Sequence, residues 1–154
     1  MAFTKFLAAA LAGIAAPAAA ADWRLAGTTY NSVAFVDLAS VAGSGPVKRF
    51  TVMRVSGQPA KDGWRTVVQK LTVHCDSRIF DDAGSRIEQS DGTVKTYPGF
   101  GATQKAVSTG IFFDMYAIVC SGRSAQKVAD PKAWTRTPLQ GRLGALNFLH
   151  NAII

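Results

Sequence analysis

The stretch WRTVVQKLTVHCDSRIF (Trp64–Phe80) decides the fold class, because it is the longest run in the chain with the alternation of a β-strand. Successive strand residues point to opposite faces of a sheet, so one face receives an apolar set and the other a polar set. The apolar set is Val67, Leu71, Val73 and Cys75, and the polar set is Thr66, Lys70, Thr72, His74, Asp76 and Arg78. The pattern predicts one long strand that ends near Phe80.

Shorter strand-like runs stand on both sides of this stretch, separated by turn residues. We expect strands within DWRLAGTTYNS (22–32), at Val33–Leu38, and within VKRFTVMRVSG (47–57), SRIEQSD (85–91) and TVKTY (93–97). Turns are predicted at AGSGP (42–46), DDAG (81–84) and Asp91-Gly92. Asp37 and Ser40 offer capping oxygens for a turn or short helix. Because there is no βαβ alternation and no glycine-rich phosphate loop, the economical prediction is an antiparallel meander.

The segment STGIFFDMYAIVCSG (108–122) follows an irregular connection, Tyr97–Val107, and favours a helix. The helical stripe consists of Ile111, Met115, Ile118 and Val119, with Ser108 or Thr109 as the cap and Gly122 at the end. A strand remains the alternative, because short apolar runs fit both. The predicted fold class is therefore α+β: an antiparallel sheet meander with a helix towards the C-terminus.

The first residues have the plan of a secretory signal peptide. A single cation, Lys5, precedes an apolar run from Phe6 to Ala16 that Pro17 breaks, and small residues allow cleavage after Ala20 or Ala21. A retained membrane helix is the weaker interpretation, because the run is short. We expect a cleaved signal peptide (1–21), one domain (22–122) and a basic tail (123–154), partly helical or disordered, in a periplasmic or secreted protein. Within the tail, Asp130-Pro131 predicts a short helix start.

The two cysteines, Cys75 and Cys120, are an even number in a chain with an export signal, which predicts a disulfide between them. That bond would tie the helix to the long strand. The alternative makes Cys75 a nucleophile with His74 as its base. Adjacent strand residues point to opposite faces, whereas such a pair needs hydrogen-bond contact, so the disulfide is favoured.

No motif nominates a catalytic, cofactor or metal site. The sequence has neither G-x-S-x-G nor H-E-x-x-H, and its two histidines, His74 and His150, leave a poor set of zinc ligands once the cysteines are paired. A net charge of +7 favours anionic partners at the surface. The cations are scattered, except that the tail carries Arg123, Lys127, Lys132, Arg136 and Arg142 against Asp130 alone. A solvated basic tail is the simpler interpretation, and export makes nucleic acid an unexpected partner.

Four landmarks occur in a characteristic order: Trp23, FVDLASV (35–41), VHCDSR (73–78) and IVC (118–120). This order resembles the surface-adhesin protein E family of small exported bacterial domains. The resemblance implies an antiparallel sheet joined to a helix by a disulfide at Cys75 and Cys120. It also implies a non-enzymatic binding module whose partner is an extracellular-matrix protein or an anionic envelope component. The alternatives are a structural accessory domain of an envelope assembly and a small periplasmic hydrolase.

Two features depart from that family. The lipid-anchoring cysteine is missing near the expected cleavage point, and STG (108–110) stands where many relatives have a proline-glycine turn. The first departure puts surface display in doubt. No ligand-binding residue carries over from the family to this sequence.

Overall fold

The computed structural model describes residues 20–29, 32–57, 63–99, 103–106 and 108–136. The expected signal peptide up to residue 19 and the apolar end of the expected tail (137–154) lie outside the described residues. No helix within the described ranges has the length and apolar character needed to cross a membrane.

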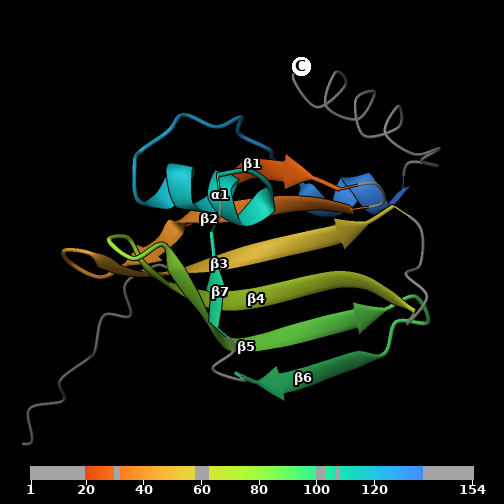
Figure 1. Ribbon diagram of the computed structural model, residues 1–154. Helices are drawn as coiled ribbons and strands as arrows, with labels where there is room; N and C mark the ends of the chain where they lie inside the picture. The colour runs from red at the N-terminus through yellow and green to blue at the C-terminus, as the bar shows by residue number, and fades with distance from the viewer. Residues whose placement is uncertain (1–19, 30–31, 58–62, 100–102, 107, 137–154) are drawn as a thin grey trace, which may run out of the picture.

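Six strands follow one another in meander order, each antiparallel to the one before it (Figure 1). They are β1 (Trp23–Thr28), β2 (Ser32–Ala42), β3 (Val47–Ser56), β4 (Trp64–His74), β5 (Ile79–Gln89) and β6 (Val94–Pro98). A short strand, β7 (Thr103–Lys105), pairs with the other end of β5 and is followed by α1 (Ile111–Val119) and the 3-10 helix η1 (Pro131–Arg136). The predicted antiparallel meander with one α-helix is confirmed.

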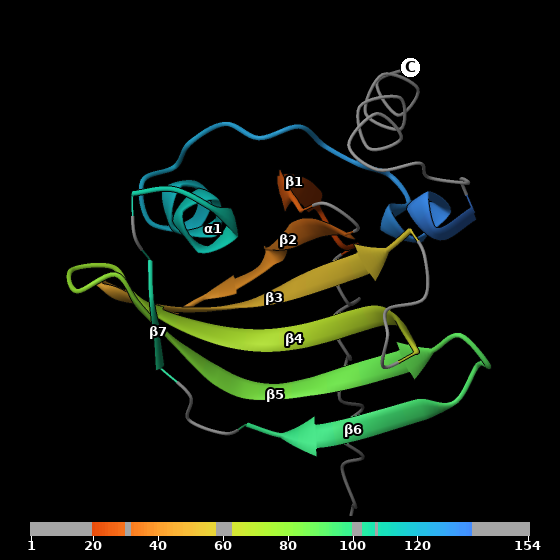
Figure 2. The ribbon, with the colours of Figure 1, turned by 45° about the vertical axis from the view of Figure 1, so that its right-hand side comes forward.

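The two faces of the sheet carry separate cores, and we name each face after the element that packs on it. The helix face packs against α1 through buried residues that include Val36, Phe50, Val52, Leu71, Val73 and Phe80. The η1 face buries Val33, Phe35, Met53 and Val55 beneath Val128 and Ala133. Because strand side chains alternate, the continuous apolar run Val33–Val36 supplies both cores at once. The main contacts of the helices are with β1–β3, and β4–β6 extend beyond them (Figure 2).

The prediction of a single strand from Trp64 to Phe80 was wrong at its end. β4 ends at His74, the chain turns through residues 75–78, and β5 begins at Ile79. The Arg78 N–H donates to the His74 carbonyl at 2.8 Å, and Arg78 adopts the left-handed φ of 57°. The polar stretch CDSR therefore forms a hairpin turn. Alternation alone missed it, because the pattern continues unbroken across the turn.

The turn predicted at DDAG (81–84) was also wrong, since these residues lie within β5. Lys70 pairs with Gly84 and Leu71 with Asp82, so Ala83 is an extra residue in the ladder. Gly84 has a φ of 132°, and its N–H donates to Asp82 Oδ1 at 2.8 Å. The turn-forming residues thus produce a β-bulge instead of a reversal.

The predicted alternation holds for the middle of β4 but not for its start. Leu71 and Val73 are buried as expected. Thr66, which we expected on a solvated face, is also buried, because it pairs with Val55 on the η1 face. The sequence pattern assumed a sheet covered on one side, whereas this part is covered on both.

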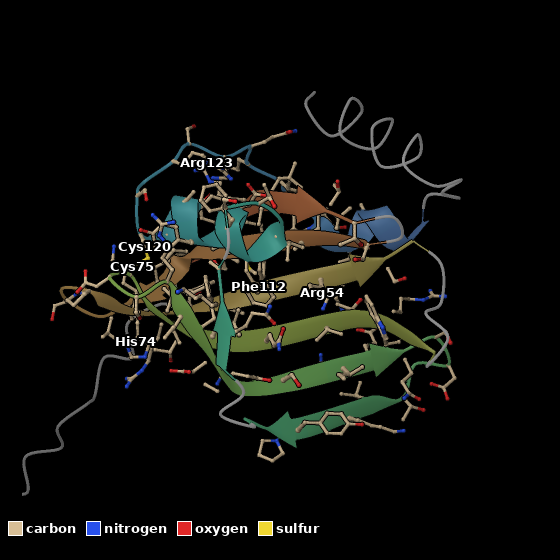
Figure 3. All side chains as sticks on the ribbon, in the orientation of Figure 1. Arg54, His74, Cys75, Phe112, Cys120 and Arg123 are labelled. Atoms are coloured by element: carbon tan, nitrogen blue, oxygen red, sulfur yellow. A yellow bond between two sulfur atoms is a disulfide. The ribbon has the colours of Figure 1, made fainter. Side chains whose placement is uncertain are left out.

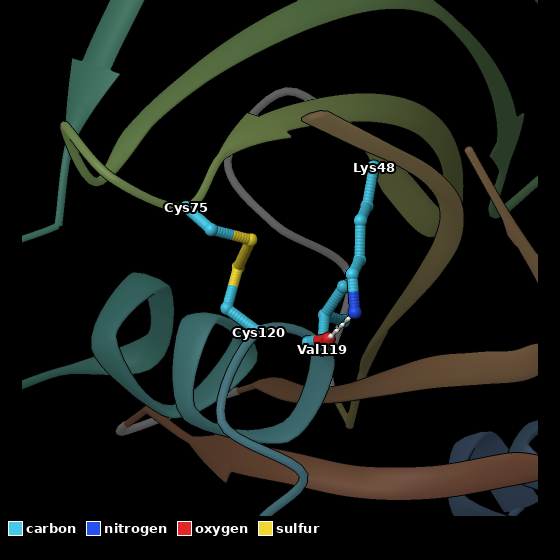
Figure 4. The surroundings of a disulfide bond; sticks show 4 residues. All are labelled: Lys48, Cys75, Val119 and Cys120. Atoms are coloured by element: carbon cyan, nitrogen blue, oxygen red, sulfur yellow. Dashed lines mark hydrogen bonds between the residues drawn. A yellow bond between two sulfur atoms is a disulfide. The ribbon is translucent and has the colours of Figure 1, made fainter. Parts of the chain in front are cut away.

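Helix α1 confirms the predicted apolar stripe, since Met115, Ile118 and Val119 are buried. Its N-cap is Gly110, and no side chain caps it, so the predicted cap at Ser108 or Thr109 was wrong. At its other end, the predicted disulfide joins Cys120 to Cys75 with a Cα–Cα distance of 5.6 Å (Figure 4). Beside the disulfide, Lys48 Nζ donates to the Val119 carbonyl at 3.1 Å. The bond therefore ties the β4–β5 turn to the C-terminal end of α1.

The start of the expected tail lies against β1. The Leu25 N–H donates to the Gln126 carbonyl at 2.8 Å, and the Val128 N–H donates to the Trp23 carbonyl at 2.9 Å. Val128 is buried in the η1-face core. At the start of η1, Asp130 Oδ1 accepts the Lys132 N–H at 3.0 Å, as its predicted capping role requires. Residues 125–133 are therefore part of the packed domain.

Candidate binding surface

Three adjoining hollows lie on the η1 face, next to the part that η1 covers. Their volumes are about 230, 190 and 380 Å³. The first and second share Arg49, and the second and third share Lys70 and Ala83. They therefore adjoin one another along β2, β3, β4, β5 and β6, and we treat them together as one shallow depression. We call this depression the basic trough.

The strand register places three cations of the trough on one diagonal line. Arg49 on β3 pairs with Thr72 on β4, and Lys70 stands two residues before Thr72. Lys70 in turn pairs with Gly84 on β5, and Arg86 stands two residues after Gly84. Diagonal neighbours of this kind are about 7–8 Å apart in an antiparallel sheet. The line Arg49, Lys70, Arg86 therefore crosses three strands in regular steps.

None of these three cations has a carboxylate partner among the described residues, and all three side chains are exposed. Other cations of the domain do have ion pairs: Arg24 and Lys127 with Asp22, Arg123 with Asp114, and Lys132 with Glu88. The three charges are therefore not neutralised by direct ion pairs, although Glu88 and Asp81 carry negative charge on the same face of β5. An exposed, concave surface of one charge concentrates ligands of the opposite charge.

His74 lies at the end of β4, on the same face as the trough. Its Nε2 is 3.0 Å from Asp81 Oδ2, and the pair is more than one third exposed. Cys75 is held in the disulfide, so the alternative in which Cys75 acts as a nucleophile is wrong. Within the described ranges, no group of three or more metal-ligating side chains comes together. His74 and Asp81 therefore form a surface pair.

A second cationic feature, on the helix face, escaped sequence reasoning. Arg54 on β3 lies on the side of the sheet that also carries Phe112 of α1 (Figure 3). Its guanidinium is 5.6 Å from the centre of the Trp64 ring, and its Nε is buried without a hydrogen-bond partner in the described part of the chain. Burial lowers the pKa of Arg54 from its usual value. A cation–π contact compensates part of the lost hydration. The only sequence signal was an arginine inside an apolar strand.

The border between η1 and the sheet carries a titratable ion pair. Lys132 Nζ donates to Glu88 Oε2 at 2.8 Å, which links η1 to β5 beside the trough. This hydrogen bond lowers the pKa of Glu88; burial opposes the shift, and the charges of Lys132, Arg86 and Arg65 add to it. The ionised form of Glu88 is therefore favoured in the folded protein.

We expect the packing of η1 to loosen in acid. A lowered folded-state pKa means that the contribution of Glu88 is complete above its usual pKa of 4.5 and is lost as the pH falls through the lower folded value. Hydrogen exchange should therefore show falling protection of the Ala133 amide below about pH 4. Glu88→Gln should abolish this loss of protection in acid. Asp91→Asn removes another carboxyl group with a lowered pKa, in the β5–β6 turn, and should leave the loss of protection unchanged. Unchanged protection of Ala133 across this range would contradict the expectation.

Comparison with known proteins gives a similarity at the level of structure. No protein-family model matches the sequence, and no curated protein matches it. Among solved structures, the chain is similar to Haemophilus influenzae protein E in crystal form II, with 14% sequence identity and a TM-score of 0.46. The similarity covers 58% of this chain and 80% of that chain.

Proposed function

We propose that this protein is an exported, non-enzymatic binding module that holds an anionic macromolecule in the basic trough. The observation that carries the proposal is the diagonal of three exposed cations in one depression, none of them paired with a carboxylate among the described residues. The disulfide supports export, because such bonds persist in oxidising compartments. The partner is an extracellular-matrix protein or an anionic component of the cell envelope.

The surroundings of His74 favour binding over hydrolysis. Hydrolysis by a histidine base needs a nucleophile or water held at hydrogen-bond distance and oriented towards the substrate. Here the Nε2 of His74 faces Asp81, and the neighbouring sulfur of Cys75 is bonded to Cys120. The trough itself is lined by cations and hydroxyl-bearing residues together with apolar residues such as Val68 and Leu71.

The proposal is tested by binding of the chain from residue 22 to immobilised matrix proteins and envelope extracts. We expect saturable binding that weakens as the salt concentration rises, because the contacts are exposed charges. Arg49→Glu should weaken binding by about tenfold or more, since it places repulsion inside the trough. The matched control is Lys95→Glu, an exposed lysine on β6 whose register with Ile87 places it on the helix face.

Two results would overturn the proposal: no binding to any anionic macromolecule, or equal losses in Arg49→Glu and Lys95→Glu. Recovery of the chain in a stable envelope complex that Arg49→Glu leaves intact would favour the structural accessory role.

A further inference from the structure

We infer that the ligand of the basic trough is a linear anionic glycan, whose sulfate or carboxylate groups meet Arg49, Lys70 and Arg86 in turn. This inference rests on the proposed function and specifies the chemistry of its ligand. The ligand would be a polymer with charges at regular intervals. It would lie across the strands, along the line from Arg49 to Arg86.

The geometry of the cation line favours a polymer over a single small anion. Two diagonal steps of about 7–8 Å place Arg49 and Arg86 roughly 15 Å apart at their backbone positions, with Lys70 between them. A lone sulfate can satisfy one of these cations but cannot bridge the line. A chain with an anionic group on successive units can contact all three, and each contact raises the effective concentration for the next one.

The other lining groups favour sugar over nucleobases. Hydroxyl-bearing residues line the 190 and 380 Å³ hollows, among them Ser40, Thr51, Thr72 and Thr96. Hydroxyl groups and strand backbone can hydrogen-bond the many hydroxyls of a glycan. Single-stranded nucleic acids instead use aromatic platforms on which bases stack. The aromatic residues at the trough offer no such platform, because the register of Phe50 and Tyr97 directs both side chains to the helix face.

The three cations of the trough take part in no salt bridge among the described residues. Elsewhere in the domain, Arg24, Arg123 and Lys132 contact carboxylates at 2.7–3.0 Å. On the same face, Asp81 pairs with Thr72, the residue that also pairs with Arg49, so the His74–Asp81 pair lies beside the cation line. Glu88, two residues after Arg86, is bound by Lys132. These two carboxylates are therefore already held by other side chains.

The test uses heparin as a heavily sulfated linear probe and the chain from residue 22, with dissociation constants measured over a series of salt concentrations. Lys70→Gln removes the middle cation and should weaken heparin binding about fivefold or more, and it should lower the salt dependence by roughly one counterion. The matched control Lys95→Gln removes the same charge from the helix face of β6 and should change the affinity by less than about twofold. Thermal unfolding of both variants should match the parent, since both side chains are exposed.

Heparin fragments of increasing length test whether one ligand contacts all three cations. Affinity should rise steeply until the fragment spans roughly 15 Å and then level off. Three results would overturn the inference: equal losses in Lys70→Gln and Lys95→Gln, competition by inorganic sulfate as strong as by long fragments, or a single-stranded oligonucleotide that binds through Lys70 more tightly than heparin. If a matrix protein binds through Arg49 while heparin does not bind, the glycan inference fails and the proposed function stands.

Discussion

Replacing both Cys75 and Cys120 by alanine should lower the free energy of unfolding by about 4 kcal/mol. The disulfide closes a loop with a sequence separation of 45 residues, and a cross-link of that span removes much conformational entropy from the unfolded chain. It also joins two elements that are distant in the chain, the β4–β5 turn and the end of α1. For a small domain, such a loss is a large share of the total stability.

Urea denaturation of the parent and the double variant would measure this loss. The parent treated with a reductant is the matched control, and its stability should fall to that of the double variant within about 1 kcal/mol. Because the chain has only these two cysteines, mispaired bonds within the chain cannot complicate the comparison. If the free energy of unfolding of the double variant falls by less than about 1 kcal/mol, the prediction is wrong. The unfolded chain would then gain little conformational entropy when the disulfide is removed.

Phe80→Ala should destabilise the protein by about 3–5 kcal/mol. The Phe80 side chain is only 1% exposed, and its ring contacts Phe50 and Phe112 at centroid distances of 6.2 and 5.3 Å. It therefore connects β5 to β3 and to α1 in one aromatic cluster. Removing the ring leaves a cavity between sheet and helix that neighbouring rings can fill only in part.

Denaturant unfolding with two controls separates this effect from a general loss of aromatic surface. Phe80→Leu keeps most of the apolar volume, so it should lower the free energy of unfolding by about half as much or less. Phe113→Ala removes the same ring from α1, but Phe113 is only half-buried and stacks on Tyr116, so its cost should be smaller. A Phe80→Ala variant within about 1 kcal/mol of the parent would contradict the role assigned to this cluster.

The elements that sequence reasoning predicted are those whose signals are local. The Asp91-Gly92 turn was predicted from two residues, and it forms between β5 and β6 with the Gly92 φ at 86°. The apolar spacing of Met115, Ile118 and Val119 predicted one face of α1. The disulfide was predicted from the cysteine count and the expected export signal. None of these predictions required knowledge of which strand lies beside which.

The features that sequence reasoning missed depend on register. Arg49, Lys70 and Arg86 are scattered in the sequence, and only the exact pairing of β3, β4 and β5 brings them into line. The pairing of β4 with β5 is set by the turn at residues 75–78 and by the bulge at Ala83. A shift of one residue would send Lys70 to the opposite face. Because the sequence pattern placed one strand where there are two, the trough could not be predicted from it.

The packing of residues 125–128 on β1 has a consequence for the order in which the chain is made. Arg24 Nη1 donates to the Ala125 carbonyl across 101 residues of sequence, and Leu25 and Val128 add backbone hydrogen bonds at the same edge. A ribosome produces β1 about 100 residues before the residues that cover its edge. Until they emerge, the outer edge of β1 is an open template for pairing with other chains, which is the usual route to aggregation. A chaperone or export factor that keeps the N-terminal strand occupied would therefore matter most during this interval.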